Sequence, residues 1–170
     1  MFQKTSVYDL PYNVFQEINK NWTLISAKDP AGKVNTMTAS WGMMGELWGK
    51  EAVTVYIRQS RYTKEFVDAQ DYFTVSLFDG YKKELGLLGS KSGRDGDKVA
   101  EAGFTPELVE GQPTFAQSKC VLICKKMYQD DIALSDMSQE LKDRWYGDGD
   151  YHTMYIGEIT ACYVNTEQPA

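Results

Sequence analysis

Histidine is almost absent from this chain, and its scarcity limits the chemistry that a site could use. His152 is the only histidine among 170 residues, so a Ser-His-Asp hydrolase or a histidine-based acid–base mechanism would have to depend on it. The sequence also lacks a Gly-x-Ser-x-Gly nucleophile elbow. We therefore interpret His152 as a structural or site-lining residue, with proton transfer as the alternative.

Cysteine is scarce as well, and the chain has no Cys-x-x-Cys pair among Cys120, Cys124 and Cys162. Cys120 and Cys124 share one face of a predicted strand, but at ~3.3 Å per residue they are roughly 13 Å apart. We expect three reduced, buried thiols and no metal site. The acidic loops at 95–97 and 148–150 also lack the ligand spacing of a calcium loop.

Long apolar runs and an excess of positive charge are missing too. No stretch approaches the ~20 apolar residues that a membrane helix needs, and the first residues lack the apolar core of a signal peptide. Lysine and arginine total 18 against 24 acidic residues, a net charge of −6, which disfavours binding to a nucleic-acid backbone. We expect a cytoplasmic protein that binds neither membrane nor nucleic acid.

The residues that are present fit one globular domain. With 170 residues, 42% of them hydrophobic, the chain can bury a sizeable core and is short for two domains, so we predict one domain over residues 1–170. Strands dominate the pattern, which favours an antiparallel sheet curled into a barrel over a doubly wound α/β sheet. The predicted strands are 22–27, 33–40, 52–57, 72–78, 120–128 and 153–164, the predicted short helices are 63–70, 82–88, 97–103 and 139–145, and 43–49 is predicted to be a loop.

Two segments carry candidate binding residues. Arg58, Ser60 and Arg61 lie between a predicted strand and a predicted helix, where guanidinium groups, hydroxyls and free N–H groups favour a phosphate. The alternative is a helix capped by Thr63 with solvated arginines. Residues 35–41 could be an ordinary strand, or could present a solvent-facing row of hydroxyls to a heterocycle's edge, with Trp41 available to stack.

A third segment, residues 90–98, combines glycines with cations. It could cover a phosphate or a polarised ring, and the alternative is a solvated turn. The chain has neither a Gly-x-Gly-x-x-Gly fingerprint nor a Walker loop, so any nucleotide would have to bind through another architecture.

Five blocks in order along nearly the whole chain carry a family resemblance. They are 35–41, then 58–63, then 92–95 with 97–98, then 103–106, and finally 145–146 through 148–152 to 155–159. Together they resemble the flavin reductase-like FMN-binding proteins, specifically the flavoredoxin-like branch. Relatives often have a proline shortly before the third strand, whereas residues 45–51 have none, so we expect a differently shaped loop over the flavin.

The resemblance implies a mainly β fold with short helices, a six-stranded antiparallel Greek-key split β-barrel. It also implies non-covalent FMN and a homodimer with the flavin near the interface. The implied activity is that of an FMN-dependent oxidoreductase that moves electrons from NAD(P)H to a flavin, a protein or a small-molecule acceptor. The alternatives are an FMN-carrying electron-transfer protein without its own NAD(P)H activity, which would have a redox protein partner, and a non-redox small-ligand-binding β-barrel.

The same resemblance assigns roles to the three segments. Residues 37–41 would contact the isoalloxazine edge, 58–63 would hold the phosphate and ribityl chain, and 91–95 would approach the ring or phosphate. We assign no catalytic acid or base, because the redox chemistry would take place on the flavin. The expected cofactor-binding residues are Asn35, Met37, Thr38, Ala39, Ser40, Trp41, Arg58, Ser60, Arg61, Tyr62, Thr63, Lys91, Ser92, Gly93, Arg94 and Asp95.

Overall fold

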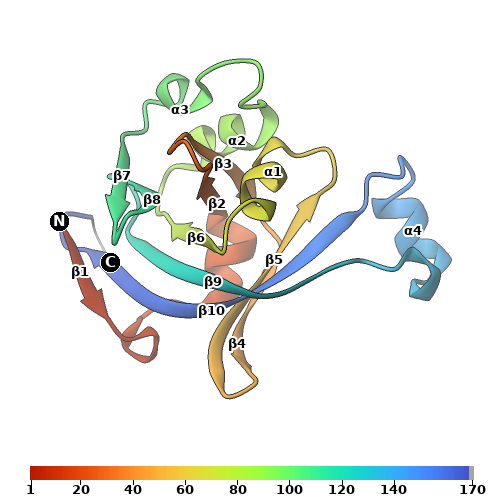
Figure 1. Cartoon of the computed structure of the whole chain (residues 1–170), viewed down its shortest axis with the longest axis horizontal. Helices are drawn as coiled ribbons and strands as arrows, with labels where there is room; N and C mark the ends of the chain where they lie inside the picture. Colours follow the sequence, from red (N-terminus) through yellow and green to blue (C-terminus); the bar gives the residue numbers. More distant parts are fainter. Residues whose placement is uncertain (169–170) are drawn as a thin grey trace.

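Strands form most of the structure, a computed structural model that describes residues 1–168 (Figure 1). The helices are short: α1 (Tyr62–Asp68), α2 (Lys82–Ser90), α3 (Lys98–Glu101) and α4 (Gln139–Trp145), with 3₁₀ turns at Val7–Asp9 and Leu134–Asp136 and a π-helix at Gln16–Asn21. The strands are β1 (Phe2–Thr5), β2 (Thr23–Lys28), β3 (Val34–Ala39), β4 (Gly42–Leu47), β5 (Lys50–Arg58), β6 (Tyr72–Leu77), β7 (Pro106–Val109), β8 (Gln112–Phe115), β9 (Cys120–Asp131) and β10 (His152–Asn165).

One antiparallel sheet contains all six predicted strands as neighbours. Its order is β3–β2–β6–β9–β10–β5–β4, with β1 beside the far end of β10, while β7 and β8 form a separate hairpin. From β5 the chain crosses through α1 to β6, beside β2, which is the long connection of a Greek key. The predicted mainly β, antiparallel barrel class is confirmed, and β1, β4, β7 and β8 are additional strands that the sequence pattern did not reveal.

The sheet curls around a core but leaves a seam between β3 and β5. Within residues 1–168 no ladder of backbone hydrogen bonds joins these two strands. Helix α1 packs against β2, β3 and β5 and covers the opening (Figure 1). Ile25, Ile57 and Phe73 are among the fully buried side chains inside, so the interior is a packed core and not a channel.

The prediction of a loop at 43–49 is wrong, because most of this segment is β4. Gly42 to Leu47 pair in register with Lys50 to Val55 of β5. Between them Trp48 and Gly49 both have positive φ angles, 57° and 73°, as a tight two-residue hairpin turn requires. Glycines and methionines gave no β-branched signal here, and the cross-strand hydrogen bonds of the hairpin override that weak local preference.

Gly157 shows how closely β10 approaches the core. It lies at a register shift between β9 and β10, and a Cβ atom placed on it would come within 2.9 Å of the Phe73 ring and 3.0 Å of the Cys124 side chain. A larger residue would therefore force the strand away from the core.

The expectations for thiols and for membrane helices can be compared with this fold. Cys120, Cys124 and Cys162 are free and buried, as predicted. Cys120 lies closest to Cys162, with 3.7 Å between the sulfur atoms. No helix among residues 1–168 is long and apolar enough to cross a membrane. The last two residues of the predicted 1–170 domain lie outside the described range.

Candidate functional site

Three hollows adjoin one another, two of them at the seam between β3 and β5 and the third against residues 14–19 and β4. The inner hollow, of 120 Å³, shares Met37 and Arg61 with the middle hollow, of 380 Å³. The middle hollow in turn shares Ser40, Trp41 and Tyr56 with the outer groove, of 770 Å³. A single elongated ligand could therefore extend from a small polar end to a wide apolar one.

Residues of β3, of the turn into α1, and of the loop after α2 line the inner hollow. They are Asn35, Met37, Ser60, Arg61, Tyr62, Thr63, Ser90, Lys91, Ser92, Gly93 and Lys98. Most of the predicted binding residues from three separate segments thus meet in one place.

Two cations in the inner hollow lack an anionic partner. Lys98 is only 5% exposed, and its ammonium group donates to the carbonyls of Leu88 and Lys91, at 2.7 and 3.0 Å. Arg61 donates to the carbonyl of Gly89 at 2.6 Å. Among the ion pairs of residues 1–168, none involves either side chain. Burial lowers the pKa of Lys98 to about 8, and burial also lowers the pKa of Arg61. Desolvated, unpaired positive charge favours binding of an anion here.

Arg58 and the polar groups of Ser60, a residue that also lines the inner hollow, meet a different environment at this turn. The Asp150 carboxylate accepts hydrogen bonds from the Ser60 backbone N–H at 3.0 Å and from its hydroxyl at 2.6 Å. Arg58 donates to the carbonyls of Asp150 and Trp145 and lies 3.6 Å from the Asp148 carboxylate. These groups, predicted to hold a phosphate, are already engaged by the protein's own acidic residues.

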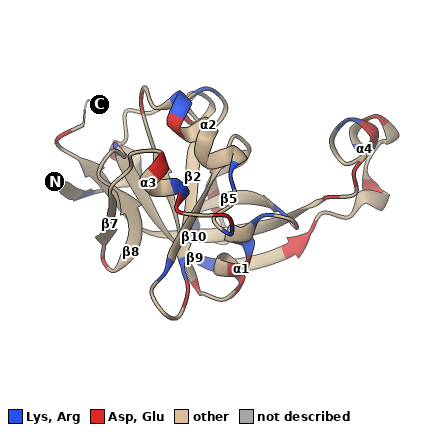
Figure 2. Ribbon diagram, turned by 90° about the horizontal axis from the view of Figure 1, so that it is seen from above, with Lys and Arg blue, Asp and Glu red and all other residues tan. Residues whose placement is uncertain are grey.

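Those acidic residues belong to an arm that stands away from the barrel. The arm comprises residues 129–151, between the outer ends of β9 and β10, and it includes α4 (Figure 1). Seen from above, the arm carries several acidic residues along its length (Figure 2). Its contact with the rest of the molecule includes the 58–60 turn and an edge-to-face contact between Trp145 and Trp41, with ring centroids 5.0 Å apart.

Aromatic rings line much of the middle hollow. Trp41, Tyr56, Trp145 and His152 contribute rings, and residues 37–40 of β3 form the opposite wall. His152 is 7% exposed, lies 4.9 Å from Trp41 between ring centroids, and pairs through Nδ1 with the Tyr146 hydroxyl at 2.9 Å. Burial, followed by the nearby Arg58, lowers the pKa of His152 to about 4. The imidazole is therefore neutral at pH 7 and lines the wall as a flat polar ring.

The alternative of a solvent-facing row of hydroxyls on residues 35–41 fails at Thr36, whereas Thr38 and Ser40 are half-buried and line the middle hollow. Thr36 is fully buried and bonds to Ser26 and to the carbonyl of Ile25, at 2.8 and 3.1 Å. Thr38 donates to the carbonyl of Leu85 in α2 at 2.5 Å. Helix α2 packs over part of the side that an isolated hairpin would leave open.

Helix capping follows one prediction and contradicts another. Asp97 caps α3, accepting from the N–H groups of Val99 and Ala100 at 3.1 and 3.0 Å, as predicted. Thr63 does not cap α1, because the N-cap residue is Arg61, and the Thr63 hydroxyl instead accepts from the Asn35 side chain at 2.9 Å. A long-range partner has replaced the local capping bond.

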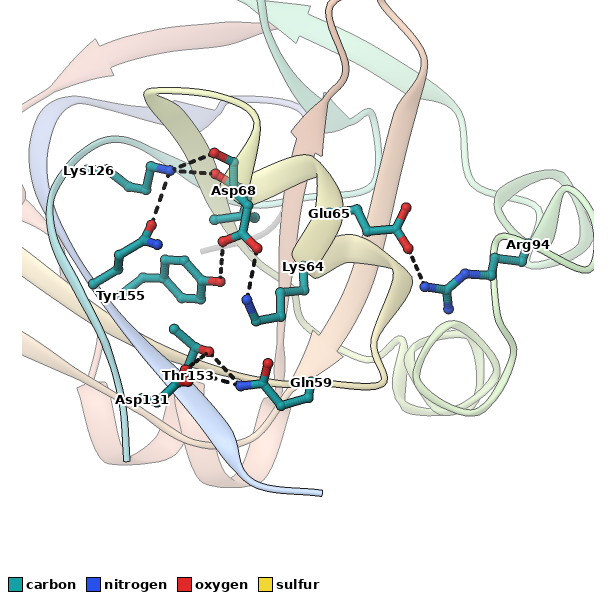
Figure 3. Close-up of polar contacts among 11 residues, drawn as sticks. Gln59, Lys64, Glu65, Asp68, Arg94, Lys126, Asp131, Thr153 and Tyr155 are labelled. Carbon is teal, nitrogen blue, oxygen red and sulfur yellow. Dashed lines mark hydrogen bonds and ion pairs between the residues drawn. The ribbon is translucent and has the colours of Figure 1, made fainter. Parts of the chain in front are cut away.

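Two of the predicted binding residues lie outside the inner and middle hollows. Arg94 bonds to Glu65 of α1 (Figure 3). Its guanidinium carbon lies 4.6 Å from the centre of the Tyr62 ring. Asp95 lines neither hollow and closes a turn through its N–H to the carbonyl of Ser92 at 3.2 Å. Both residues belong to the support of the loop and not to its inner surface.

Four residues that line the inner or middle hollow, Tyr56, Ser90, Lys98 and Trp145, were not among the expected cofactor-binding residues. Tyr56 lies two positions before Arg58 on the same strand, so side-chain alternation alone would have placed it on the same face. Lys98 follows the capping Asp97 and belongs to the 90–98 segment, for which a solvated turn was the alternative to covering a phosphate. Trp145 reaches the middle hollow through its contact with Trp41, a long-range contact that no local pattern encodes.

Comparisons with known proteins bear on this geometry. The flavin reductase like domain model matches residues 15–170. No match was found among curated proteins. An FMN-binding domain of a flavin reductases-like enzyme from Shewanella baltica OS155 superposes with a TM-score of 0.70 at 17% identity, over 98% of this chain and 78% of that one.

Two further solved structures are similar over most of their length. Flavoredoxin of Desulfovibrio vulgaris (Miyazaki F) gives a TM-score of 0.66 at 21% identity, over 97% of this chain and 78% of that chain. The styrene monooxygenase flavin reductase of Pseudomonas putida S12 gives 0.65 at 17% identity, over 87% and 81%. At these identities the superpositions establish the shared fold.

Proposed function

The chain belongs to the flavin reductase-like domain family, and from this premise we propose that it binds FMN along the seam and acts as an FMN-dependent oxidoreductase. The observation that carries the proposal is the junction of the inner and middle hollows at Met37 and Arg61. One side of this junction holds unpaired cations and the other holds aromatic rings. A phosphate joined to a flat heterocycle has the matching chemistry.

The inner hollow would hold the phosphate. Its buried Lys98 and half-buried Arg61 form no ion pair with a carboxylate among the described residues, and Thr63 and Ser92 belong to the same lining. Binding a phosphate would supply the anion that these desolvated cations lack. Of the two predicted arginines, only Arg61 lines this hollow, whereas Arg58 lies on the middle hollow beside the arm.

The middle hollow would hold the flat ring system between the end of β3 and the aromatic wall. Bound FMN would supply the redox chemistry, accepting and releasing electrons in its ring. The protein orients the ring, keeps a neutral imidazole at its edge through His152, and leaves the adjoining groove open for a reactant. None of these roles requires a protein acid or base.

We propose NAD(P)H as the electron donor and a flavin, protein or small molecule as the acceptor. The outer groove supports a small reactant, because it adjoins the middle hollow through Ser40, Trp41 and Tyr56 and offers room for a nicotinamide. The second candidate, an electron carrier reduced by a basic protein partner, is favoured by the acidic arm beside the same hollow (Figure 2).

Purification and anaerobic mixing test these assignments. Purified protein should be yellow, or should take up FMN, and should release the flavin on acid precipitation. Colourless protein that cannot take up FMN would rule out both redox functions and leave a non-redox ligand-binding barrel. Rapid bleaching of the bound flavin by NADH or NADPH supports the oxidoreductase, whereas bleaching only by a reduced protein donor supports the carrier.

We also propose a homodimer with the flavin close to the interface. Phe15 is 85% exposed and Met43 is 55% exposed, and both line the outer groove. A second copy would cover this apolar surface beside the flavin. Sedimentation showing only monomer at micromolar concentration would contradict this. Three free cysteines are consistent with our further expectation of a cytoplasmic location.

A further inference from the structure

A fourth hollow lies on the far side of the loop that closes the inner one. This outer-loop hollow has a volume of 580 Å³ and is bordered by the basic side chains of Lys33 and Arg94. Asn35, Gly93 and Lys98 line both this hollow and the inner hollow. These three residues therefore form a partition between a compartment of 120 Å³ and a much larger one.

Asn35 is held rigidly in that partition. Its side chain is 5% exposed, and its amide donates to the Thr63 hydroxyl at 2.9 Å, which ties β3 to α1 across the seam. The amide oxygen then points at the backbone of Gly93, where a Cβ atom would lie only 2.2 Å away. The same Cβ would lie 3.3 Å from the Tyr62 ring.

Glycine at position 93 is thus required by space and not by backbone conformation. Its φ angle lies outside the left-handed region, so an alanine could adopt the backbone conformation. Only the contact with Asn35 excludes a side chain, because real Cβ atoms do not approach other atoms at such distances. The loop reaches its closed position because Gly93 has no side chain.

Contacts on both sides of Gly93 hold the loop in place. On the outside, Arg94 bonds to Glu65 (Figure 3). It also donates to the carbonyl of Ser60 at 3.2 Å, and its guanidinium lies over the Tyr62 ring. On the inside, the Lys98 ammonium bonds to the carbonyl of Lys91. The partition is therefore a braced wall and not a loose flap.

We propose that this partition makes the protein select FMN over flavin adenine dinucleotide (FAD), through the contact between Asn35 and Gly93. The inference rests on the proposed function, because it assumes that the inner hollow receives the flavin phosphate. A terminal phosphate ends inside the inner hollow, whereas a diphosphate must continue through the partition to an adenosine. The outer-loop hollow, with Lys33 and Arg94, is the space that the adenylate half would occupy once the partition was opened.

Binding titrations with FMN and FAD test the partition directly. The wild-type protein should bind FMN at least about tenfold more tightly than FAD. Asn35→Ala removes the amide from the wall and should reduce this ratio by about tenfold, because FAD gains a path outward. Adding Lys33→Ala to Asn35→Ala should weaken FAD more than FMN, because Lys33 lines the outer-loop hollow and touches the lining of the inner hollow only through Tyr62.

A glycine pair supplies the matched control. Gly93→Ala should displace the loop and change the FAD-to-FMN ratio, whereas Gly86→Ala in α2, whose Cβ would meet nothing within 4 Å, should not. Equal affinity of the wild type for both flavins would overturn the inference. So would an unchanged ratio in folded Asn35→Ala and Gly93→Ala. A wild type that binds neither flavin would instead refute the proposed function, and this inference with it.

Discussion

The two sides of the turn between β5 and α1 carry the same kinds of side chain in opposite electrostatic states. On the arm side, Arg58 and Ser60 are matched by the Asp148 and Asp150 carboxylates. On the barrel side, Arg61 and the nearby Lys98 are desolvated and bond only to backbone carbonyls. The positive charge on the arm side is already neutralised by carboxylates, whereas the positive charges on the barrel side favour binding of an anion.

This difference teaches that a motif rich in arginine and hydroxyl groups identifies a site only once its partners are known. Within one turn, three positions separate a structural arginine from a candidate ligand-binding one. Removing an internally satisfied cation should disturb local structure, whereas removing an unsatisfied one should disturb ligand binding.

Substituting the two arginines separately should give the largest contrast. Arg61→Ala should weaken FMN binding by about 1.5–3 kcal/mol, roughly 10- to 150-fold, because it removes a charged hydrogen-bond donor from the inner hollow. Arg58→Ala should weaken it much less. Fluorescence titration with FMN measures both, and circular dichroism controls for folding. Equal effects of the two substitutions would remove the distinction between the two sides.

Substituting Lys98 should distinguish binding of the phosphate from binding of the ring system. Lys98→Met removes the buried charge and should weaken FMN binding by about tenfold while leaving riboflavin, which has no phosphate, nearly unaffected. Lys64→Met in α1 is the matched control, because Lys64 already pairs with Asp68 at 2.8 Å and lines neither hollow. Parallel loss of FMN and riboflavin would show that Lys98 supports the fold and not the phosphate.

The pH dependence should follow the same lysine. With its pKa lowered from 10.5 to about 8, Lys98 in the ligand-free protein loses its proton well before an unfolded lysine does. Affinity for FMN should therefore fall by about fivefold between pH 7.5 and 9, since binding then requires proton uptake. Titrations at several pH values measure this slope, and Lys98→Met should abolish it.

The contribution of Lys98 to the free energy of unfolding should change with pH in the direction opposite to the FMN affinity. Between pH 8 and 10.5 the unfolded chain holds a proton on Lys98 that the folded chain lacks, so the contribution of this group to stability rises with pH. Denaturation of wild type and Lys98→Met without ligand isolates it. A difference that does not vary with pH would contradict the low pKa.

Releasing the arm should have the smallest effect on the ligand. Asp150→Asn weakens the contacts to Ser60 and Arg58 and should change FMN affinity by less than about threefold. It should instead increase proteolytic cleavage within residues 129–151, because the arm loses part of its anchor. A large loss of FMN affinity would mean that the two sides of the turn do not act independently.

The sequence predicted the barrel better than it predicted the site. Alternating β-branched and aromatic residues, such as those of β5 and β6, identified six strands because sheet burial follows a period of two. The β4 strand escaped, since its glycines and methionines carry no such pattern and its structure depends on the partner strand. Short helices were found from turn residues such as Asp97, whose capping bond is local.

Predicted site residues come together in one hollow where a local motif carries the binding chemistry, and lining residues were missed where their position depends on distant contacts. Asn35, Met37 and Arg61 meet as expected, because the strand and the turn lie across one seam. No local signal could show that Asp150, far along the chain, occupies the turn beside Arg58. The burial of Lys98 likewise favours covering a phosphate over a solvated turn for this residue, which the sequence left open.

The seam gives the ligand a mechanical role. FMN bound across it would bridge β3 and the start of α1, which among residues 1–168 are connected by side-chain bonds such as Asn35–Thr63 and not by a strand ladder. The barrel can open locally at the seam without separating any paired strands. Release of the cofactor and local opening of the wall would then occur together, because bound flavin would close the gap in the barrel that no strand pairing closes.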